Sequence, residues 1–404
     1  MAAQLDVFLP LPLTNRGPGY TCGVLAQGMA GSELNVTIVT PRARAQPVFP
    51  ADIVQVLPNW ARYVPYRWVR SRAKDTIEAA FLSQTGVPRT SPHGAYIWPD
   101  ASLETVIKLK RSNITVFREM INCHRGTAKV ILDDAYARIG APPRHTITDV
   151  SVIAEQQMLE AVDYIFCPNQ MVEDSLLAHG LPASKYISTS YGWDPARFRG
   201  SKALLGPYDG MTAVFAGTIC VRKGCHLLLD YWAQSNTRGR LILAGALEET
   251  IKEKCADLLA RDNVVVIDFV PDVGALYRTA DVFVFPSLEE GGPQVTYEAC
   301  GCGLPVITTP MGAGRIVRQN QEGFVLDPYD REGWITAIRT LAADHDRRRA
   351  MGLAAARRAQ SFVWNTVALR RRHQILDHLS NGHDDPQRPT TAHNPHDLDW
   401  HDIQ

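Results

Sequence analysis

Residues 281–308 read DVFVFPSLEEGGPQVTYEACGCGLPVIT, and this stretch decides the fold of the chain. An apolar run stops at Pro286, a loop with two glycines follows, and a helical pattern then leads into a second apolar run. Pro293 suits the first helical position, where its missing N–H costs nothing. The free amides of this helix start, beside Gly291 and Gly292, predict a seat for a phosphate. The stretch therefore reads as a strand–loop–helix–strand unit of a parallel sheet.

Two carboxylates of this stretch can accept hydrogen bonds from sugar or ribose hydroxyls: Glu290 on the loop and Glu298 about a turn inside the helix. The pair resembles the E-x7-E signature of the retaining glycosyltransferases of family four, which have the GT-B fold. That resemblance implies that Glu298 holds the donor ribose and that Glu290 lies by the transferred sugar. It also implies that the segment from Gly291 to Gln294 binds the donor. Two solvated glutamates near a turn are the alternative interpretation.

The length and composition of the chain narrow the choice of protein class. At 404 residues it is too long for one hydrophobic core, so two domains are expected. Lysine plus arginine and aspartate plus glutamate both number 42, so the overall charge gives no indication of nucleic-acid binding. Eight scattered cysteines without a CxxC pair predict buried thiols in a reducing cytoplasm, and not a zinc site or a disulfide framework.

Short apolar runs alternate with helical patterns along most of the chain, which predicts an α/β protein with helix-covered parallel sheets. A polar, glycine-rich break predicts a Rossmann-like domain at 1–190, a linker at 191–210 and a second Rossmann-like domain at 211–362. The resemblance implies that these domains face each other across a cleft and that a closing helix at 363–378 crosses back to the first. The tail at 379–404 is poor in aliphatic residues and is predicted to be disordered.

The second domain opens with a strand that runs into a glycine loop, VFAGTICVRKG at residues 214–224. The cations of this loop, Arg222 and Lys223, can neutralise a diphosphate. The loop resembles the family's donor loop, where basic residues stabilise the nucleoside diphosphate leaving group without a metal. The resemblance gives that role to Arg222 and Lys223 and places Gly217 in the donor site. Many members carry an arginine directly after the first glycine, where this chain has Thr218, so the phosphate that each cation contacts stays open.

The first domain offers weaker candidates. Gly17 and Gly19 lie in a loop between the first strand and a helix, where backbone can approach a ligand closely. They resemble the family's glycine-rich loop on the acceptor side of the cleft. His124 follows a strand, and family members often carry a histidine near the donor sugar there. It lies a few residues later than usual, so Arg118 or Glu119 in that place, or a structural role for His124, are alternatives.

Segment 62–74 mixes basic and aromatic residues without an acid, which suits contact with an anionic membrane surface or an anionic acceptor. A solvated basic helix is the alternative. No stretch reaches the roughly 18 apolar residues needed to span a bilayer. We therefore expect a cytoplasmic protein, or one that is peripheral at the inner membrane face.

Taken together, the resemblance implies transfer of a sugar from a nucleotide diphosphate sugar to the hydroxyl of a sugar or lipid-linked acceptor, in bacterial polysaccharide or glycolipid assembly. No DxD motif follows a predicted strand, so neither a metal nor a cofactor is expected. A GT-B sugar-nucleotide epimerase and a non-catalytic sugar-nucleotide binder are the alternatives. The epimerase would turn over the donor with no acceptor present, and the binder would release no nucleoside diphosphate.

Overall fold

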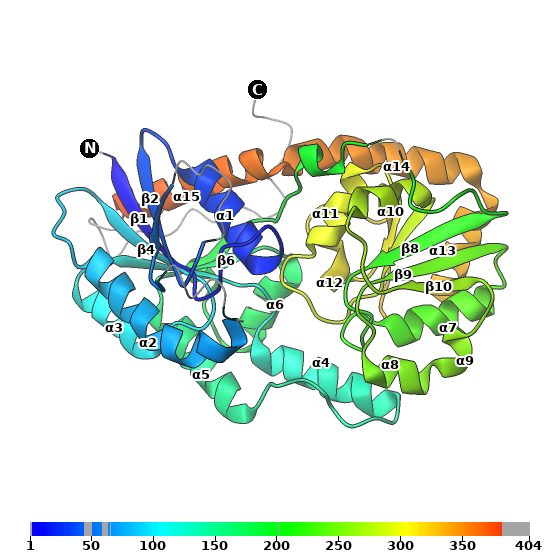
Figure 1. The fold of residues 1–404 in the computed structure, drawn as a ribbon, viewed down its shortest axis with the longest axis horizontal. Helices are drawn as coiled ribbons and strands as arrows, with labels where there is room; N and C mark the ends of the chain where they lie inside the picture. Colours follow the sequence, from blue (N-terminus) through cyan, green and yellow to red (C-terminus); the bar gives the residue numbers. More distant parts are fainter. Residues whose placement is uncertain (1, 44–50, 59–63, 65, 201, 382–404) are drawn as a thin grey trace.

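The protein consists of two α/β domains that lie side by side along the long axis of the molecule (Figure 1). The structure is a computed structural model, and it describes residues 2–43, 51–58, 64, 66–200 and 202–381. Each domain is built on a sheet in which all paired strands are parallel, as the alternation of apolar runs and helical patterns predicts.

The first domain has a seven-stranded sheet in the order β3-β2-β1-β4-β5-β6-β7. Its strands are β1 (Ala3–Phe8), β2 (Leu34–Thr40), β3 (Asp52–Gln55), β4 (His93–Ile97), β5 (Thr115–Glu119), β6 (Tyr164–Cys167) and β7 (Tyr186–Ser188). Its helices are α1 (Gly17–Met29), α2 (Tyr66–Thr85), α3 (Leu103–Arg111), α4 (Arg125–Arg138), α5 (Asp149–Ala161), α6 (Gln170–Ala178) and the 3₁₀ turn η2 (Ala183–Lys185). The strand order reverses between β1 and β4, which is where open α/β sheets form a ligand crevice at their carboxyl ends.

The second domain has a six-stranded sheet in the order β10-β9-β8-β11-β12-β13. Its strands are β8 (Met211–Ala216), β9 (Gly239–Ala244), β10 (Val264–Ile267), β11 (Val282–Phe285), β12 (Val306–Thr308) and β13 (Gly323–Val325). Its helices are α7 (Cys225–Ser235), α8 (Glu249–Lys254), α9 (Ala256–Leu259), α10 (Val273–Thr279), α11 (Gln294–Gly301), α12 (Pro310–Ala313), α13 (Arg331–Ala343), α14 (His345–Ala359) and the 3₁₀ turn η4 (Gln360–Phe362). Since β8 and β11 are neighbours, the two loops that the sequence singled out leave the sheet side by side.

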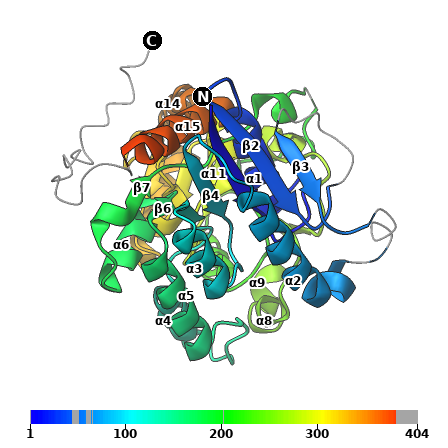
Figure 2. The ribbon, with the colours of Figure 1, turned by 90° about the vertical axis from the view of Figure 1, so that its left-hand side faces the viewer.

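Helices cover both faces of each sheet, and the sequence shows why. Every residue of β1, β8 and β9 is buried, which is the pattern of a parallel strand packed on both sides. In the first domain Leu5 and Val7 pack in the cluster that holds α1, whereas Phe8 packs in the cluster formed by α2 and α3. Figure 2 looks onto this domain and shows the strands spread from β3 at one edge to β6 and β7 at the other.

A long C-terminal helix joins the two domains. Helix α15 (Trp364–Asn381) runs back from the second domain and packs along α1 of the first (Figure 1). Its Arg371 is fully buried and donates hydrogen bonds to Glu119 at the end of β5, at 2.7 and 3.2 Å. The helix extends past residue 378, the predicted end, so residues 379–381 are helical and not part of a disordered tail. The rest of that predicted tail lies outside the described residues.

The predicted linker, residues 191–210, lies between β7 and β8 and contains the 3₁₀ turn η3 (Pro195–Phe198). Trp193 anchors it, because its backbone N–H donates to Phe362 at 3.0 Å and its indole N–H donates to Ala359 at 2.8 Å. A Cβ on Gly301 would overlap the Trp193 ring. The linker is therefore packed against α11 and the segment that leads into α15.

Candidate active site

The loop between β8 and α7, called the donor loop after the resemblance, has a glycine with positive φ at each end. Gly217 has φ +135° and ends β8, and Gly224 has φ +67° and caps α7. A Cβ on Gly224 would overlap the carbonyl oxygen of Pro286, so only glycine allows the two loops to approach so closely. This contact carries Arg222 and Lys223 to the loop that holds Glu290.

The structure brings three of the predicted site residues together at this point. Lys223 and Glu290 form an ion pair, and both side chains are largely buried. The hydroxyl of Ser287 donates to Glu290 Oε1 at 3.0 Å, and Arg222 Nη1 lies 4.0 Å from Glu290 Oε2. Two cations from the β8 loop and a carboxylate from the β11 loop thus form one cluster at the carboxyl ends of neighbouring strands.

Glu298 makes separate contacts. It lies within α11, where Gln294 donates to its Oε1 at 3.0 Å, and its burial raises the pKa of the carboxyl group to about 7. The guanidinium of Arg197 opposes this rise and itself lies 4.4 Å from the centre of the Tyr20 ring. Glu298 therefore faces the linker and α1, whereas Glu290 faces Lys223.

The loop between the two glutamates packs against the first domain. A Cβ on Gly291 would overlap the backbone of Ile121, and a Cβ on Gly292 would overlap the ring of Tyr191. Gly291 is therefore required for the close approach of the first domain and Gly292 for the close approach of the linker, a reason that the sequence alone does not indicate. Pro293 is the N-cap and not the first helical residue, because α11 begins at Gln294.

Glu289 is a site residue that the sequence analysis missed. Its carboxylate is buried and accepts hydrogen bonds from the Asn122 side chain at 2.7 and 2.9 Å and from the Cys123 N–H at 3.1 Å. Arg222 Nη1 also donates to it at 3.3 Å. Glu289 thus joins the first domain to the donor loop of the second. Its position next to Glu290 at the end of an apolar strand was the available signal.

The loop with Gly17 and Gly19 also reaches the second domain. Gly17 has φ +64° at the start of α1, and a Cβ on Gly19 would overlap the Pro12 carbonyl. From the first turns of α1, Thr21 donates a long hydrogen bond of 3.4 Å to Gln294. The loop with Gly17 and Gly19 and helix α11 are therefore adjacent.

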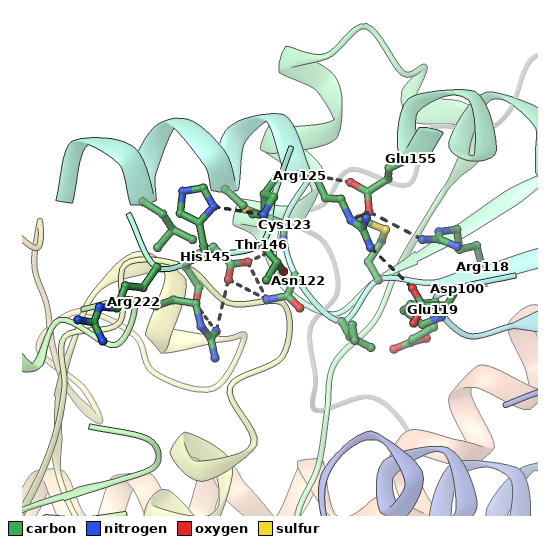
Figure 3. Close-up of a pocket in the computed structure, with 18 residues that line it drawn as sticks. Asp100, Arg118, Glu119, Asn122, Cys123, Arg125, His145, Thr146, Glu155 and Arg222 are labelled. Atoms are coloured by element: carbon green, nitrogen blue, oxygen red, sulfur yellow. Dashed lines mark hydrogen bonds and ion pairs between the residues drawn. The ribbon is translucent and has the colours of Figure 1, made fainter. Parts of the chain in front are cut away.

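A cavity of about 500 Å³ opens between the two domains (Figure 3). The first domain contributes charged side chains at its walls, among them Arg118, Arg125 and Glu155. The second domain contributes Arg222 and Glu289. The cavity thus begins at the donor-loop cluster and extends along the ends of β5 and α4.

His124 is not among the residues that line this cavity, and its contacts are with the start of α4 and with the ring of His179. It is buried, caps α4 by accepting the Gly126 N–H at 3.1 Å, and stacks on the ring of His179. Burial lowers its pKa to about 4, so the ring is neutral at pH 7. Of the residues that the sequence left as alternatives, Arg118 and Glu119 line the cavity. These contacts favour the structural alternative for His124, and its place near a donor sugar stays a prediction.

Two further observations concern ligands other than the donor. In the described part of the chain, no group of three or more His, Cys, Asp or Glu side chains lies close enough to hold a metal ion. The basic segment 62–74 lies partly outside the described residues, so its contact with a membrane or an acceptor stays a prediction.

Comparison with known proteins agrees with this geometry. Residues 210–344 match the family model described as glycosyl transferases group 1. D-inositol 3-phosphate glycosyltransferase of Kineococcus radiotolerans is 30% identical over 250 residues, which cover 54% of this chain and 58% of that protein. The same enzyme of Pseudarthrobacter chlorophenolicus is 34% identical over 194 residues, which cover 44% and 46%. The chain thus matches about half the length of these curated relatives.

Solved structures match nearly the whole chain. Sucrose-phosphate synthase from Thermosynechococcus elongatus superposes with a TM-score of 0.68 at 18% identity, covering 94% of this chain and 99% of that one. WaaG, a glycosyltransferase involved in lipopolysaccharide biosynthesis, gives 0.64 at 15% identity and covers 92% and 99%. The Anabaena protein HepE in complex with UDP-glucose gives 0.62 at 16% identity and covers 92% and 99%. These likenesses show the GT-B fold of two Rossmann-like domains, which the sequence predicted.

Proposed function

We propose that the chain is a retaining, metal-independent glycosyltransferase that moves a sugar from a nucleoside diphosphate sugar to an acceptor hydroxyl. The observation that carries the proposal is the cluster of Arg222, Lys223 and Glu290 at the carboxyl ends of β8 and β11. It pairs cations for a departing diphosphate with a carboxylate for the sugar, inside a domain that matches the group 1 glycosyltransferases.

The cluster suggests a division of roles. Negative charge grows on the diphosphate as the sugar leaves, and fixed cations lower that barrier because they need no reorganisation. Arg222 can bind two phosphate oxygens through parallel hydrogen bonds, whereas Lys223 acts as a point charge. Glu290 would accept hydrogen bonds from the sugar, and Glu298 with Gln294 would bind the ribose. No strong general base is required, since the leaving phosphate can take the acceptor proton.

The proposal for the acceptor is less specific than the proposal for the donor. A sugar or a lipid-linked sugar fits the assembly of a bacterial polysaccharide or glycolipid, and segment 62–74 is the proposed membrane contact of a cytoplasmic or peripheral enzyme. Among the described residues, no helix combines the length and the apolar character needed to cross a bilayer. The curated relatives carry the name of an enzyme for D-inositol 3-phosphate, which motivates testing charged acceptors.

The test begins with a screen of UDP-, GDP- and ADP-sugars for thermal stabilisation, since a ligand that binds the folded state raises its stability. With the best donor, Glu290→Gln should slow transfer about 100- to 1000-fold while the donor affinity changes only a few-fold. Glu249→Gln, on exposed α8, is the matched control and should leave both unchanged.

Three results would contradict the proposal. An unchanged rate of transfer in Glu290→Gln would show that Glu290 does not act on the transferred sugar. If no nucleotide sugar stabilises the protein against heat, the proposed donor site is wrong. Turnover of the sugar nucleotide to an isomer with no acceptor present would favour an epimerase.

A further inference from the structure

We propose that the interdomain cavity binds an anionic group of the acceptor, a phosphate or a carboxylate, and that Arg118 is its central ligand with Arg125 and Arg144 beside it. This proposal rests on the proposed function, because it concerns the acceptor side of the same cleft. It names a class of acceptor, a negatively charged sugar, that the donor-site residues alone do not indicate.

Arg118 is the strongest evidence. It lies in β5, is 4% exposed and lines the cavity. Its Nε has no hydrogen-bond partner among the described residues, and the nearest acid is Glu155, whose Oε1 lies 3.8 Å from Arg118 Nη2. A buried guanidinium with so weak a partner is costly, and an anion that accepts two of its N–H groups would remove most of that cost.

Two more arginines of the first domain line the same cavity. Arg125, the first residue of α4, lies 3.4 Å from Glu155 and 3.8 Å from Asp100 (Figure 3). Arg144 is exposed on the loop after α4 and has no ion pair within the described part of the chain. Glu155 is shared by Arg118 and Arg125. Burial also raises the pKa of the Glu155 carboxyl above its ordinary value, so this one acid neutralises the charges of the two arginines incompletely.

The remaining acids of the cavity wall are already bound elsewhere. Glu119 is held by Arg371, and Glu289 is held by Asn122, Cys123 and Arg222. The other two acids of the lining, Asp100 and Glu155, then stand against three arginines of the first domain, so this part of the wall carries one more cation than acid. A singly or doubly charged ligand group fits that excess.

The position of these arginines indicates the acceptor and not the donor. They come from the first domain, whereas the cations proposed for the donor diphosphate, Arg222 and Lys223, come from the β8 loop. Arg222 also lines the cavity, from the second domain, so an acceptor anchored at Arg118 would extend toward the donor cluster. A volume of about 500 Å³ lies within the range of pockets that hold small organic ligands.

Calorimetric titration of the full chain, saturated with its nucleoside diphosphate, tests the proposal. The probes are inorganic phosphate, glucose 6-phosphate, glucuronate and glucose at one ionic strength. We expect at least one anionic probe to bind at least tenfold more tightly than glucose. Arg118→Met should weaken that probe about tenfold or more, because hydrogen bonds to charged groups contribute strongly. The tighter of the phosphate and carboxylate probes identifies the anionic group.

Arg144→Gln serves as the second variant, because its exposed side chain leaves folding intact if Arg118→Met does not fold. It should also weaken the anionic probe, and Arg357→Gln on the exposed face of α14 should not. Equal affinity for glucose and the anions would overturn the proposal, as would unchanged anion affinity in the arginine variants. Competition between the probe and the nucleoside diphosphate would reassign the arginines to the donor. If nucleoside diphosphates bind and the anions do not, this inference fails alone; if neither binds, the proposed function fails.

Discussion

The two halves of this molecule build their sides of the cleft in different ways. In the second domain, the chemistry-bearing residues occupy two short loops, 217–224 and 286–298, that leave neighbouring strands β8 and β11. In the first domain, Asp100, Arg118, Arg125, Arg144 and Glu155 come from five separate segments and meet only in the folded domain. The candidate site of the second domain is therefore readable as motifs, whereas the cavity wall of the first domain depends on tertiary structure.

The proposed function would give this difference a physical basis. A diphosphate is common to all donors of this kind, and glycine loops with adjacent cations are a local solution for binding it. The acceptor side must discriminate among different molecules, so its residues can be drawn from any strand end that faces the cleft. The same comparison predicts that long-range contacts matter more for the first domain than for the second.

The largest expected effect tests this dependence directly. Arg371→Met should destabilise the protein by about 3–5 kcal/mol, because it leaves the buried Glu119 carboxylate without its cation. Arg371 also donates to Tyr96 at 2.8 Å and to the Ser190 carbonyl at 3.1 Å, so the first domain loses several bonds at once. Denaturant unfolding followed by circular dichroism measures the change.

Arg349→Met on the exposed face of α14 is the control and should change stability by less than about 0.5 kcal/mol. The double variant Glu119→Gln, Arg371→Met should recover part of the loss, because it removes the unpaired charge. A loss for Arg371→Met no larger than for the control would mean that α15 is not required to hold the first domain together.

A somewhat smaller effect concerns Glu298 in the motif-built half. Its folded pKa of about 7 lies above the ordinary value of 4.5, so the folded state holds a proton that the unfolded state releases. Stability should therefore fall as the pH rises from about 4.5 to 7, by about 3 kcal/mol relative to Glu298→Gln. Urea unfolding of both proteins at pH 5, 6, 7 and 8 gives this difference directly. A constant difference across that range would show that the carboxylate is solvated and would leave its burial against the linker unsupported.

The sequence predicts most of the fold and the part of the candidate site that lies in two short motifs. The strands were recognisable because buried parallel strands are continuous apolar runs. Lys223 and Glu290 were found because each lies in a loop with glycines at a strand end. The ion pair between Arg371 and Glu119 cannot be predicted from the sequence, because 252 positions separate the two residues and neither belongs to a motif. His124 is a candidate only by resemblance, and its contacts with Gln156 of α5 and with His179 after α6 are indicated by no local pattern.

The smallest expected effect concerns the residue that joins the two halves. Glu289→Gln replaces one acceptor oxygen by an NH₂ group that faces the donor NH₂ of Asn122, and it removes the charge that attracts Arg222. Hydrogen bonds to a charged acceptor contribute about 1.5–3 kcal/mol each, and the amide keeps part of them. We therefore expect the contact between the two domains at residue 289 to lose about 1–2 kcal/mol of stability. Faster hydrogen exchange at the Cys123 amide, which donates to Glu289, reports that loss, and Glu249→Gln on exposed α8 should leave it unchanged. If the Cys123 amide exchanges at the same rate in the unaltered protein and in both variants, the Glu289 carboxylate does not hold the two domains together. Packing at Gly291 and Gly292 would then account for their contact.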